Sequence, residues 1–588
     1  MTFYRKKYDI IVVGAGHAGC EAALAAARMG CSVLLMAIDL DKVAAMPCSP
    51  SIGGMAKGQL VKEIDALGGE MAKITDKTAI QYRTLNTKKG PAVHSSRTQN
   101  DKIRYHMAMK AVLEKQPNLD LKQAMVDRLV MENGRVVGVE DQTGFGYPAD
   151  AVVLATGTFL SGLVHIGFNS FKAGRAGEFA SYGLPAHLKT LGFELGRMKT
   201  GTPPRLKKSS IDFNAFVKHG TEEDPVPFSF FTEKIVMPQL PSYIGHTSKR
   251  SHQIVEKNLK RSALYGGIIK GVSARYCPSF EDKIVRFPHK EKHQIILEPE
   301  GLDTDEIYAS GLGNSLPMEI QIQFVRSVKG EAAAQGIWSG INAACKIEGR
   351  PPFILDRSQA YMAVMVDDLV TRGTREPYRM FTSRAEYRLM LREDNADLRL
   401  MEMGHEFGLI DDDTLKDVKE RKKQIAHEVK RIKSTVIKPD KITNDYLLGK
   451  GTKPINNGIY LDQLLKRAEL DYTAVKTLAR SSNNISSKVA KQVEIGIKYE
   501  GYIKRQLKEI DKFKNLERMK IPQDFDFTRI HGLSNELKEK LSAVMPSSLG
   551  QASRIDGITP AGLSVIMIAI KAAEKQGDKT KNRRSNDP

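Results

Sequence analysis

A run of apolar and β-branched residues near the start of the chain predicts its first strand, Tyr8–Val13. A glycine-rich stretch follows, and Cys20–Arg28 then has the alanine-rich composition of a packed helix. A second apolar run, Cys31–Met36, predicts another strand. Strand, glycine loop, helix and strand in this order predict the start of a βαβ unit in a parallel sheet.

The stretch between the first strand and the helix contains three glycines with the spacing of a dinucleotide-binding loop. Gly14 permits a tight turn, Gly16 allows the backbone to approach a pyrophosphate, and Gly19 allows helix and strand to pack closely. The N–H groups at the start of the helix would face the phosphates. The predicted contacts with an adenine dinucleotide are Gly14, Ala15, Gly16, His17, Ala18 and Gly19.

Two features bear on which dinucleotide the loop binds. An acid that binds the ribose is expected about 20 residues beyond the glycines. Asp39 and Asp41 compete for this role, and both could equally be turn-forming acids of a loop. Ala151–Thr158 predicts another buried strand, which ends in an Ala-Thr-Gly-Thr sequence. Flavoproteins with two dinucleotide domains often return to the cofactor on such a strand, so this pattern favours a flavin.

Changes in periodicity along the chain predict its domain organisation. Residues 1–200 form the first part of the dinucleotide-binding domain, and 201–290, where prolines and aromatics are frequent, form an inserted domain. Residues 291–400 return to the first domain, and 401–588 turn helical and strongly charged. The expected fold class is α/β: a Rossmann-like dinucleotide-binding domain with an inserted second domain and an all-helical C-terminal domain.

The C-terminal segment contains several helix signals. Leu415–Lys433 is highly charged, which is typical of a solvated helix face. Thr559 followed by Pro560 predicts a cap and a first-turn proline for a final apolar helix. A further stripe recurs at helical steps and consists of Tyr499, Ile503, Leu507, Ile510 and Phe513.

Composition narrows the class of protein. The 588-residue chain carries a net charge of +20, which favours a polyanionic partner, nucleic acid above all, over general surface basicity. Its 5 cysteines are scattered without CxxC spacing, which argues against a disulfide framework or a metal site and for a reducing compartment. The longest apolar stretch after the first strand, Leu563–Ile570, is too short to span a membrane. We therefore expect a cytoplasmic protein with no membrane partner.

Two cysteines have the setting of reactive thiols. Cys48 lies between two prolines, so a stiff loop is expected, and a helix start with Lys57 follows closely. Cys277 precedes a proline and follows Arg275 by two residues. Each could instead be inert, but together they suggest nucleophilic addition to an electrophilic ring carbon such as pyrimidine C6. The other three cysteines, Cys20, Cys31 and Cys345, are predicted to pack in the core.

Several longer motifs resemble the MnmG (GidA) family, and the likeness covers nearly the whole chain. The matching segments are Pro47–Gly54, Asp65–Gly69, Lys89–Val93, Lys199–Arg205, Arg275–Ser279, Glu376–Leu389, Lys498–Ile503 and Gly550–Ile555. The resemblance implies an FAD- and NADH-dependent enzyme that adds an aminomethyl or carboxymethylaminomethyl group to C5 of the wobble uridine of tRNA, with methylene-tetrahydrofolate as the one-carbon donor. It also implies a homodimer that works with the GTPase MnmE in a heterotetramer.

The resemblance assigns roles to residues. Cys48 and Cys277 would be the catalytic thiols, and Val126 and Ser181 would contact the FAD held by the glycine loop. The helical C-terminal domain would bind MnmE and help to hold tRNA. The implied NADH contacts, which make 201–290 the NADH-binding domain, are Ser273, Ala274, Arg275, Tyr276, Pro278, Ser279, Phe280, Glu281, Asp282, Lys283, Ile284, Val285, Arg286 and Phe287.

The chain departs from the family pattern at two places. Gly271–Arg275 lacks the family's Gly-Pro, which could loosen the thiol loop. Near residue 330, Arg326–Gly330 runs directly into Glu331–Gly336, where the family has a longer segment that closes over the flavin. Weaker FAD binding is expected from this gap.

Two alternative functions stay open. One is a catalytically impaired protein that binds tRNA or the GTPase, which the gap would explain. The other is a folate-dependent tRNA uracil methyltransferase, a related flavoprotein that lacks the helical C-terminal domain.

Overall fold

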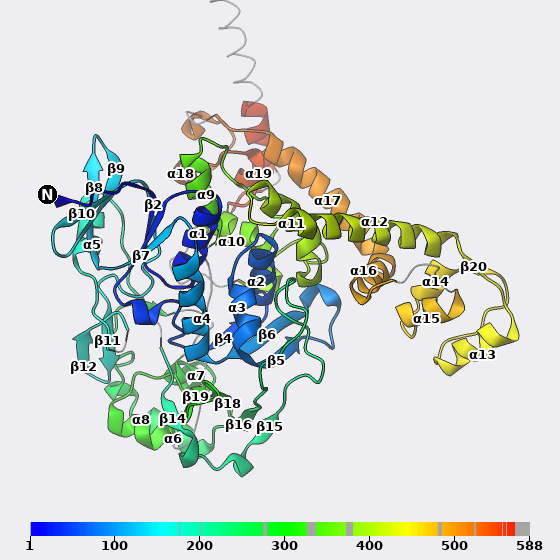
Figure 1. The fold of residues 1–588 in the computed structure, drawn as a ribbon, viewed down its shortest axis with the longest axis horizontal. Helices are drawn as coiled ribbons and strands as arrows, with labels where there is room; N and C mark the ends of the chain where they lie inside the picture. Colours follow the sequence, from blue (N-terminus) through cyan, green and yellow to red (C-terminus); the bar gives the residue numbers. More distant parts are fainter. Residues whose placement is uncertain are drawn as a thin grey trace, which may run out of the picture. The chain divides into compact units, whose positions relative to one another are not determined.

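The computed structural model, drawn in Figure 1, contains two compact units. Unit 1 comprises Met1–Ile354, Glu376–Thr382 and Arg392–Lys419, and unit 2 comprises Leu355–Arg375, Ser383–Leu391 and Glu420–Pro588. The residues that the structure describes are 2–175, 177–199, 201–273, 279–325, 337–371, 380–479, 485–522, 525–555, 557–559 and 561–570.

A mainly parallel sheet forms the centre of the N-terminal part of unit 1. Its strand order is β7-β3-β2-β10-β9-β8, in which β7, β3, β2 and β10 pair in parallel and β10, β9 and β8 form an antiparallel extension. The strands are β2 (Tyr8–Val13), β3 (Val33–Ala37), β7 (Leu119–Gln123), β8 (Val126–Glu132), β9 (Arg135–Asp141) and β10 (Phe145–Leu154), with β1 (Thr2–Phe3) pairing with β10.

Helices cover the parallel strands and explain their apolar composition. α1 (His17–Arg28) packs on β2 and β3, and α9 (Ile337–Ile347) packs on α1 and β10. Val126, Leu129 and Val139 of the β8–β9 hairpin pack on the other face, so Ile10–Val12 are completely buried. The predicted first strand, glycine loop and helix are confirmed. The strand expected over Ala151–Thr158 begins earlier, because β10 also pairs with β9, and it ends earlier, at Leu154. The expected burial is wrong for its last four residues, which are half-buried or exposed.

A second, fully antiparallel sheet of unit 1 has the order β14-β19-β18-β16-β15. Its strands are β14 (Arg205–Lys207), β15 (Val217–His219), β16 (Ser242–His246), β18 (Gln294–Pro299) and β19 (Glu306–Ser310). α6 (Lys249–Lys257), α7 (Phe280–Arg286) and α8 (Met318–Val325) supply apolar side chains to its core. The sheet therefore continues past residue 290. The boundaries expected at 200, 290 and 400 stay predictions.

A third sheet carries the segment that follows the predicted cysteine loop. β4 (Ser51–Gly53) pairs with β6 (Ser95–Asn100), which pairs with β5 (Ala79–Leu85). α2 (Lys57–Ala66) and α3 (Met71–Thr78) pack on it, α11 (Ala396–Glu406) packs on α2, and α4 (Lys102–Lys115) follows β6. Shorter elements of unit 1 are β11 (Leu163–Ile166), β12 (Asn169–Lys172), α5 (Gly183–Thr190), β13 (Met198–Lys199) and β17 (Val272–Ser273).

In its described residues unit 2 is almost entirely helical, as predicted, with one short strand pair, β20 (Val436–Ile437) and β21 (Ile459–Tyr460). Apolar cores lie around Leu464 and Val493 and around Phe527 and Leu541. Its helices are α10 (Tyr361–Thr371), α13 (Lys441–Gly449), α14 (Leu461–Leu465), α15 (Tyr472–Leu478), α16 (Ser487–Lys498), α17 (Glu500–Arg518), α18 (Asn535–Val544) and α19 (Leu549–Ala552), while α12 (Asp412–Ser434) bridges the boundary in the sequence.

The helix signals of the C-terminal segment have different outcomes. Thr559 caps the last described helix, over 561–570, because its Oγ1 accepts a hydrogen bond from the Gly562 N–H at 3.1 Å. Pro560 lies outside the described residues. The apolar stripe of α17 is only partly buried, since Ile510 is 7% exposed and Leu507 is 44% exposed.

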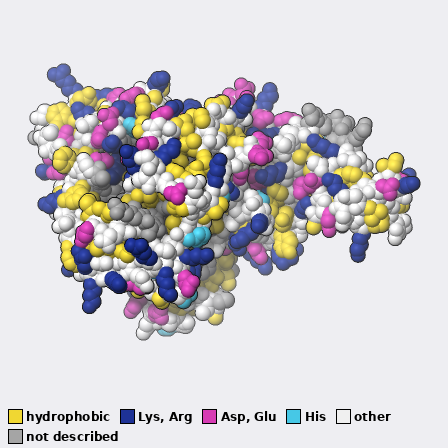
Figure 2. All heavy atoms as spheres, turned by 90° about the horizontal axis from the view of Figure 1, so that it is seen from below, with side chains coloured by type: hydrophobic (Ala, Val, Ile, Leu, Met, Phe, Trp, Pro, Cys, Tyr) yellow, Lys and Arg dark blue, Asp and Glu magenta, His cyan; other side chains and the backbone are white. Residues whose placement is uncertain are grey.

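The surface is rich in charge. Figure 2 shows lysine and arginine side chains over much of one face, with acidic side chains between them. Among the described residues, none of the helices is both long enough and apolar enough to span a bilayer.

Candidate active site

The glycine loop after β2 has the geometry of a dinucleotide cradle. Gly14 has a φ of +105°, and a Cβ there would lie 2.4 Å from the Ala155 carbonyl oxygen; a Cβ on Gly19 would lie 1.7 Å from the Gly14 carbonyl oxygen. These two glycines are therefore required by the fold itself. Gly16 differs, because nothing lies within 4 Å of a Cβ built on it. Free space beside Gly16 fits the approach of a pyrophosphate.

The start of α1 fits an anion. Gly16 is its N-cap, no side chain caps the helix, and its first turn has no acidic residue. The N–H groups and the positive end of the helix dipole are thus available to phosphate. His17 is half-buried, and its buried Nε2 atom has no hydrogen-bond partner among the described residues. Burial and the charge of Arg175 lower the pKa of His17 to about 4, so the imidazole is neutral near pH 7.

The two further predicted flavin contacts lie in different settings. Ser181 is 5% exposed and its hydroxyl has no hydrogen-bond partner within the described part of the chain, which leaves it able to bond to a ligand. Val126 belongs to the apolar core around β8 and β9. The free space at Gly16 and the unpartnered groups of His17 and Ser181 together fit a large polar cofactor. The role of each residue in binding stays a prediction.

The candidate ribose-binding acids both have local partners. The Asp39 side chain accepts the Asp41 N–H at 2.8 Å and caps a short 3-10 helix, Leu40–Lys42. The Asp41 carboxylate pairs with Lys110 at 2.9 Å. In this structure Asp39 therefore acts as a turn-forming acid.

The Cys48 loop starts at the dinucleotide cradle. The Ala44 N–H donates to the Ala15 carbonyl at 2.8 Å, and Cys48 follows four residues later. Four extended residues span at most about 14 Å, so Cys48 lies no further than that from Ala44, which is bonded to the glycine loop. Cys48 is half-buried and lies in a loop before β4, as the flanking prolines predicted.

Three neighbouring strands of the second sheet hold this loop. Arg205 of β14, Tyr308 of β19 and Glu298 of β18 are directly opposite one another, and directly opposite residues project from the same face. The Tyr308 hydroxyl lies 2.9 Å from the Cys48 Sγ atom. Arg205 Nη2 donates to the carbonyls of Pro47 and Cys48 at 2.7 and 3.0 Å.

Buried carboxylates hold this contact in place. Ser49 Oγ donates to Glu298 at 3.0 Å, and Glu298 also pairs with Arg97. Arg205 Nε donates to the completely buried Glu300 at 2.8 Å, and its guanidinium lies 4.9 Å from the centre of the Tyr308 ring. Burial raises the pKa of Tyr308 far above its ordinary value, so its hydroxyl stays neutral.

The remaining cysteines divide as follows. Cys20, Cys31 and Cys345 are buried, as predicted, and burial raises the pKa of each thiol, to about 11 for Cys31. Inert packing is the role that this environment supports. Cys277 lies outside the described residues, so its relation to Cys48 stays a prediction.

The described part of the predicted NADH segment has mainly structural contacts. Ser279 caps α7 in a reciprocal pair with Asp282. Phe280 and Ile284 lie in the core of the second sheet, and the Glu281 carboxylate accepts hydrogen bonds from Ser262 and Ser315. Contacts of this segment with NADH stay a prediction. The implied residues that lie outside the described part are Ala274, Arg275, Tyr276 and Pro278.

Fold and site together define a class: a dinucleotide-binding α/β protein that holds a half-buried loop thiol beside its cofactor cradle and carries a helical C-terminal unit. Three family models match the chain: glucose inhibited division protein A over residues 9–330, and the C-terminal helical domain and helical bundle of the tRNA-modifying enzyme MnmG/GidA over 412–507 and 509–588. The chain belongs to the MnmG/GidA family, whose members are FAD-dependent enzymes that modify tRNA.

Individual relatives agree over nearly their whole length. The chain is 56% identical to the tRNA uridine 5-carboxymethylaminomethyl modification enzyme MnmG of Syntrophobacter fumaroxidans, covering 97% of this chain and 96% of that protein. It is 48% identical to MnmG of Thermodesulfovibrio yellowstonii, covering 97% and 99%. The crystal structure of Aquifex aeolicus GidA matches with a TM-score of 0.87 at 41% identity, covering 96% of this chain and 98% of that one.

The relatives are longer within the aligned region. The alignment with the Syntrophobacter protein spans 619 positions and the chain has 588 residues, so at least 31 positions of that relative have no counterpart here. The first family model ends its match at residue 330, where a missing segment was expected. Residues 326–336 lie outside the described part, so the structural effect of the gap stays a prediction.

Sequence reasoning missed the residues that contact the thiol loop. Tyr308, Glu298 and Glu300 were not identified, and Arg205 was noted only within a family motif. One signal was present: two glutamates interrupt the apolar run Ile295–Gly301, and acids within a buried strand require partners.

Proposed function

We propose that this chain modifies C5 of the wobble uridine of tRNA, adding an aminomethyl or carboxymethylaminomethyl group. The observation that carries the proposal is the half-buried Cys48 thiol on a loop bonded to the dinucleotide cradle through Ala44 and Ala15. FAD fits the cradle, NADH would reduce it, and methylene-tetrahydrofolate would supply the carbon. When bound, FAD supplies the redox chemistry that delivers the folate-derived carbon.

The thiols would activate the uracil ring. A thiolate, from Cys48 or Cys277, adds to C6, and the electron pair of the C5–C6 double bond makes C5 nucleophilic toward the one-carbon unit. Loss of the C5 proton and departure of the thiolate then restore the ring. Cys48 has the accessibility that this step requires, since it is half-buried whereas Cys20, Cys31 and Cys345 are buried.

A pocket of unit 2 supports tRNA as the substrate. Four of the residues around this 450 Å³ surface pocket are cationic, and the 61% exposed Tyr502 ring lies 5.5 Å from the Arg505 guanidinium. Cations that meet phosphates beside an aromatic ring that stacks on a base are the usual elements of single-stranded RNA binding. The cationic residues are Lys466, Lys498, Lys504 and Arg505.

Partners and location follow from the family. We propose a cytoplasmic homodimer that forms a heterotetramer with the GTPase MnmE, which would bind the helical C-terminal domain. Matches of the MnmG/GidA helical models over 412–507 and 509–588 weigh against the folate-dependent methyltransferase, which lacks that domain.

The test is modification of tRNA in vitro with NADH, methylene-tetrahydrofolate, GTP and the partner GTPase, followed by nucleoside mass spectrometry. We expect the modified uridine with the native chain and none with Cys48→Ser or Cys277→Ser, whereas Cys345→Ser, at a buried thiol, keeps the activity. Normal modification by Cys48→Ser would remove that residue from the chemistry.

A second candidate, a tRNA- or GTPase-binding protein without catalysis, is favoured by one observation: at least 31 aligned positions of the Syntrophobacter relative are missing here. The visible spectrum of the purified protein separates the two. Flavin absorbance supports the enzyme, and a colourless protein that binds tRNA supports the binding protein.

A further inference from the structure

The structure points to a function for Tyr308, which no sequence motif identified. We propose that the Tyr308 hydroxyl orients the Cys48 side chain and stabilises its thiolate, and that Arg205 positions the loop that carries the thiol. This inference rests on the proposed function, because it gives Cys48 a chemical role. It adds a residue of the second sheet to a site otherwise built on the first and third.

Once the Cys48 thiol is ionised, its hydrogen bond with Tyr308 can have only one donor, the Tyr308 hydroxyl. In the neutral state either the Cys48 thiol or the Tyr308 hydroxyl can donate across the 2.9 Å contact. A thiolate has no proton, so the hydroxyl must then donate. A hydrogen bond to the charged form favours that form. Tyr308 is completely buried, so its own ionisation does not compete.

The surroundings hold the hydroxyl in place. Tyr308 lies in the middle of β19, with Arg205 and Glu298 opposite it on the two neighbouring strands. Ser49 is bonded to Glu298, and the Cys48 carbonyl is bonded to Arg205. The residues on both sides of the thiol contact are thus tied to the same three strands, which fixes the sulfur relative to the hydroxyl.

Arg205 acts through the backbone. Its guanidinium donates hydrogen bonds to the Pro47 and Cys48 carbonyls and lies over the Tyr308 ring. A further hydrogen bond, from Arg205 Nε to Glu300, fixes the orientation of the guanidinium. A lysine could not make these contacts together, because it lacks the planar fork of donors. Arg205 is therefore a positioning residue for the loop.

The experiment is the pH dependence of Cys48 alkylation by iodoacetamide, measured by peptide mass spectrometry on the full-length protein. Tyr308→Phe keeps the ring and removes the hydroxyl. We expect the midpoint of the pH–rate profile to rise by about one unit and the rate at pH 7 to fall about tenfold. Tyr147→Phe is the matched control, since Tyr147 is also buried and its hydroxyl donates a hydrogen bond away from the thiol, to the Asp141 carboxylate at 3.1 Å.

A purely structural role gives a different result. If the hydroxyl only kept the loop ordered, Tyr308→Phe would react faster at every pH with an unchanged midpoint, and that outcome overturns the proposal. An unchanged profile also overturns it. Independently of any variant, the midpoint for native Cys48 must lie below that of a synthetic peptide of residues 44–52, and a higher value contradicts a stabilised thiolate.

Failure of the proposed function is distinguishable from failure of this inference. If Cys48→Ser still modifies tRNA, Cys48 is not catalytic, yet the alkylation profile of Tyr308→Phe still reports whether the hydroxyl stabilises the thiolate. If Cys48→Ser loses tRNA modification and the alkylation profile of Tyr308→Phe is unchanged, the proposed enzymatic function is supported and the proposed role of Tyr308 is contradicted.

Discussion

The glycines of the cofactor loop differ in whether they are needed for folding or for cofactor binding. Gly14 and Gly19 are required by backbone contacts within the protein, whereas Gly16 faces free space. The same sequence motif therefore contains two kinds of glycine. One kind is needed before any ligand binds, and the other is needed only when it does.

Replacing Gly16 tests this distinction. We expect Gly16→Ala to keep the native melting temperature within about 2 °C and to lower the flavin-to-protein ratio of the purified protein, because the added methyl occupies space beside the phosphates. Gly19→Ala is expected to unfold at a lower temperature. Gly496→Ala, where a Cβ also meets nothing within 4 Å, is the control with unchanged flavin content. Full flavin content in Gly16→Ala would contradict the cradle assignment.

Glu21 gives α1 a pH-dependent stability. Its carboxylate is 1% exposed and accepts the N–H groups of Glu70 and Met71, yet burial raises its pKa from 4.5 to about 7. Between these values the folded state holds a proton that the unfolded state has lost. The stability that this group contributes is therefore complete below about pH 4.5 and is lost as the pH rises through about 7.

The variant Glu21→Gln removes this titration. We expect its melting temperature to improve relative to the native protein as the pH rises from 5 to 8, corresponding to a free energy on the order of 3 kcal/mol. Asp65, whose pKa burial raises to about 6, is present in both proteins and cancels. A difference in melting temperature that is constant with pH would show that Glu21 is ionised in the folded state.

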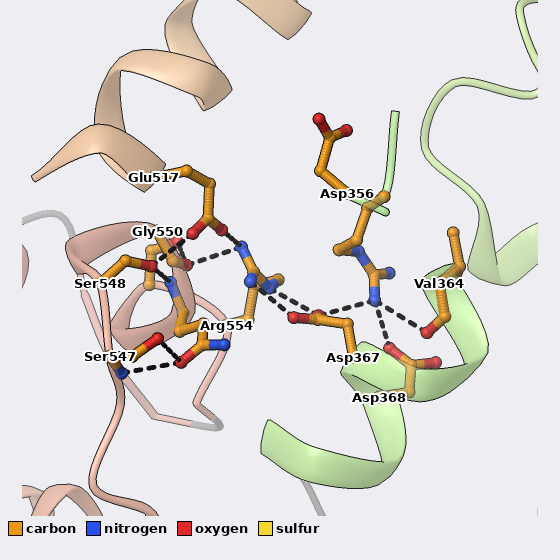
Figure 3. Close-up of polar contacts among 12 residues, drawn as sticks. Asp356, Val364, Asp367, Asp368, Glu517, Ser547, Ser548, Gly550 and Arg554 are labelled. Atoms are coloured by element: carbon orange, nitrogen blue, oxygen red, sulfur yellow. Dashed lines mark hydrogen bonds and ion pairs between the residues drawn. The ribbon is translucent and has the colours of Figure 1, made fainter. Parts of the chain in front are cut away.

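At the scale of elements, one arginine joins three helical segments of unit 2. Arg554, just after α19, makes two contacts of 2.7 Å with Asp367 of α10 and one of 2.6 Å with Glu517 of α17 (Figure 3). It also donates to the Gly550 carbonyl at 2.8 Å. Its side chain is 11% exposed, so solvent screens these contacts weakly. The periodicity of apolar residues does not predict that these parts of the chain are in contact.

Arg554→Lys removes the planar fork while keeping the charge. We expect faster hydrogen exchange in α19 and the C-terminal half of α10, where Asp367 lies, by about tenfold to a hundredfold, because about 2 kcal/mol of bidentate bonding is lost. Arg529→Lys is the control, since Arg529 is 87% exposed in its pair with Asp526. Equal exchange in both variants would mean that apolar packing alone holds these segments together.

At the scale of the whole molecule, charge is the dominant property. The net charge is +20, and acidic residues are used to organise the basic ones. Glu500 pairs with Lys433, Lys466 and Lys504, and these pairings lower its pKa to about 2. Glu500 therefore holds two lysines of the unit 2 pocket, Lys466 and Lys504, in fixed positions. A fixed group of cations is suited to binding a polyanion.

The binding of tRNA is expected to weaken steeply between 50 and 200 mM salt, because the counterions that the protein displaces from the phosphates are then released into a more concentrated salt solution. Tyr502→Ala is expected to lower the affinity about tenfold with an unchanged salt slope, because stacking does not depend on counterions. Lys498→Gln is expected to make the slope shallower. Filter binding at several salt concentrations measures both, and an unchanged affinity in Tyr502→Ala would exclude the pocket from RNA binding.

The sequence by itself determined the elements whose causes are local. Strand β2, the glycine loop and α1 follow from apolar runs and from glycine geometry over fewer than thirty residues. The cap at Thr559 and the loop around Cys48 depend on side chains and prolines within a few positions. Family motifs led to the predicted cofactors and partners, which composition and periodicity could not specify.

Only the tertiary structure decided what contacts the thiol. Tyr308 is 260 positions from Cys48 and Arg205 is 157, and strand pairing across the second sheet brings them together. Local periodicity carries no information about partners at such separations, because register and packing set them. The same reason explains why the sheet of the insert extends past residue 290 and why Arg554 reaches Asp367.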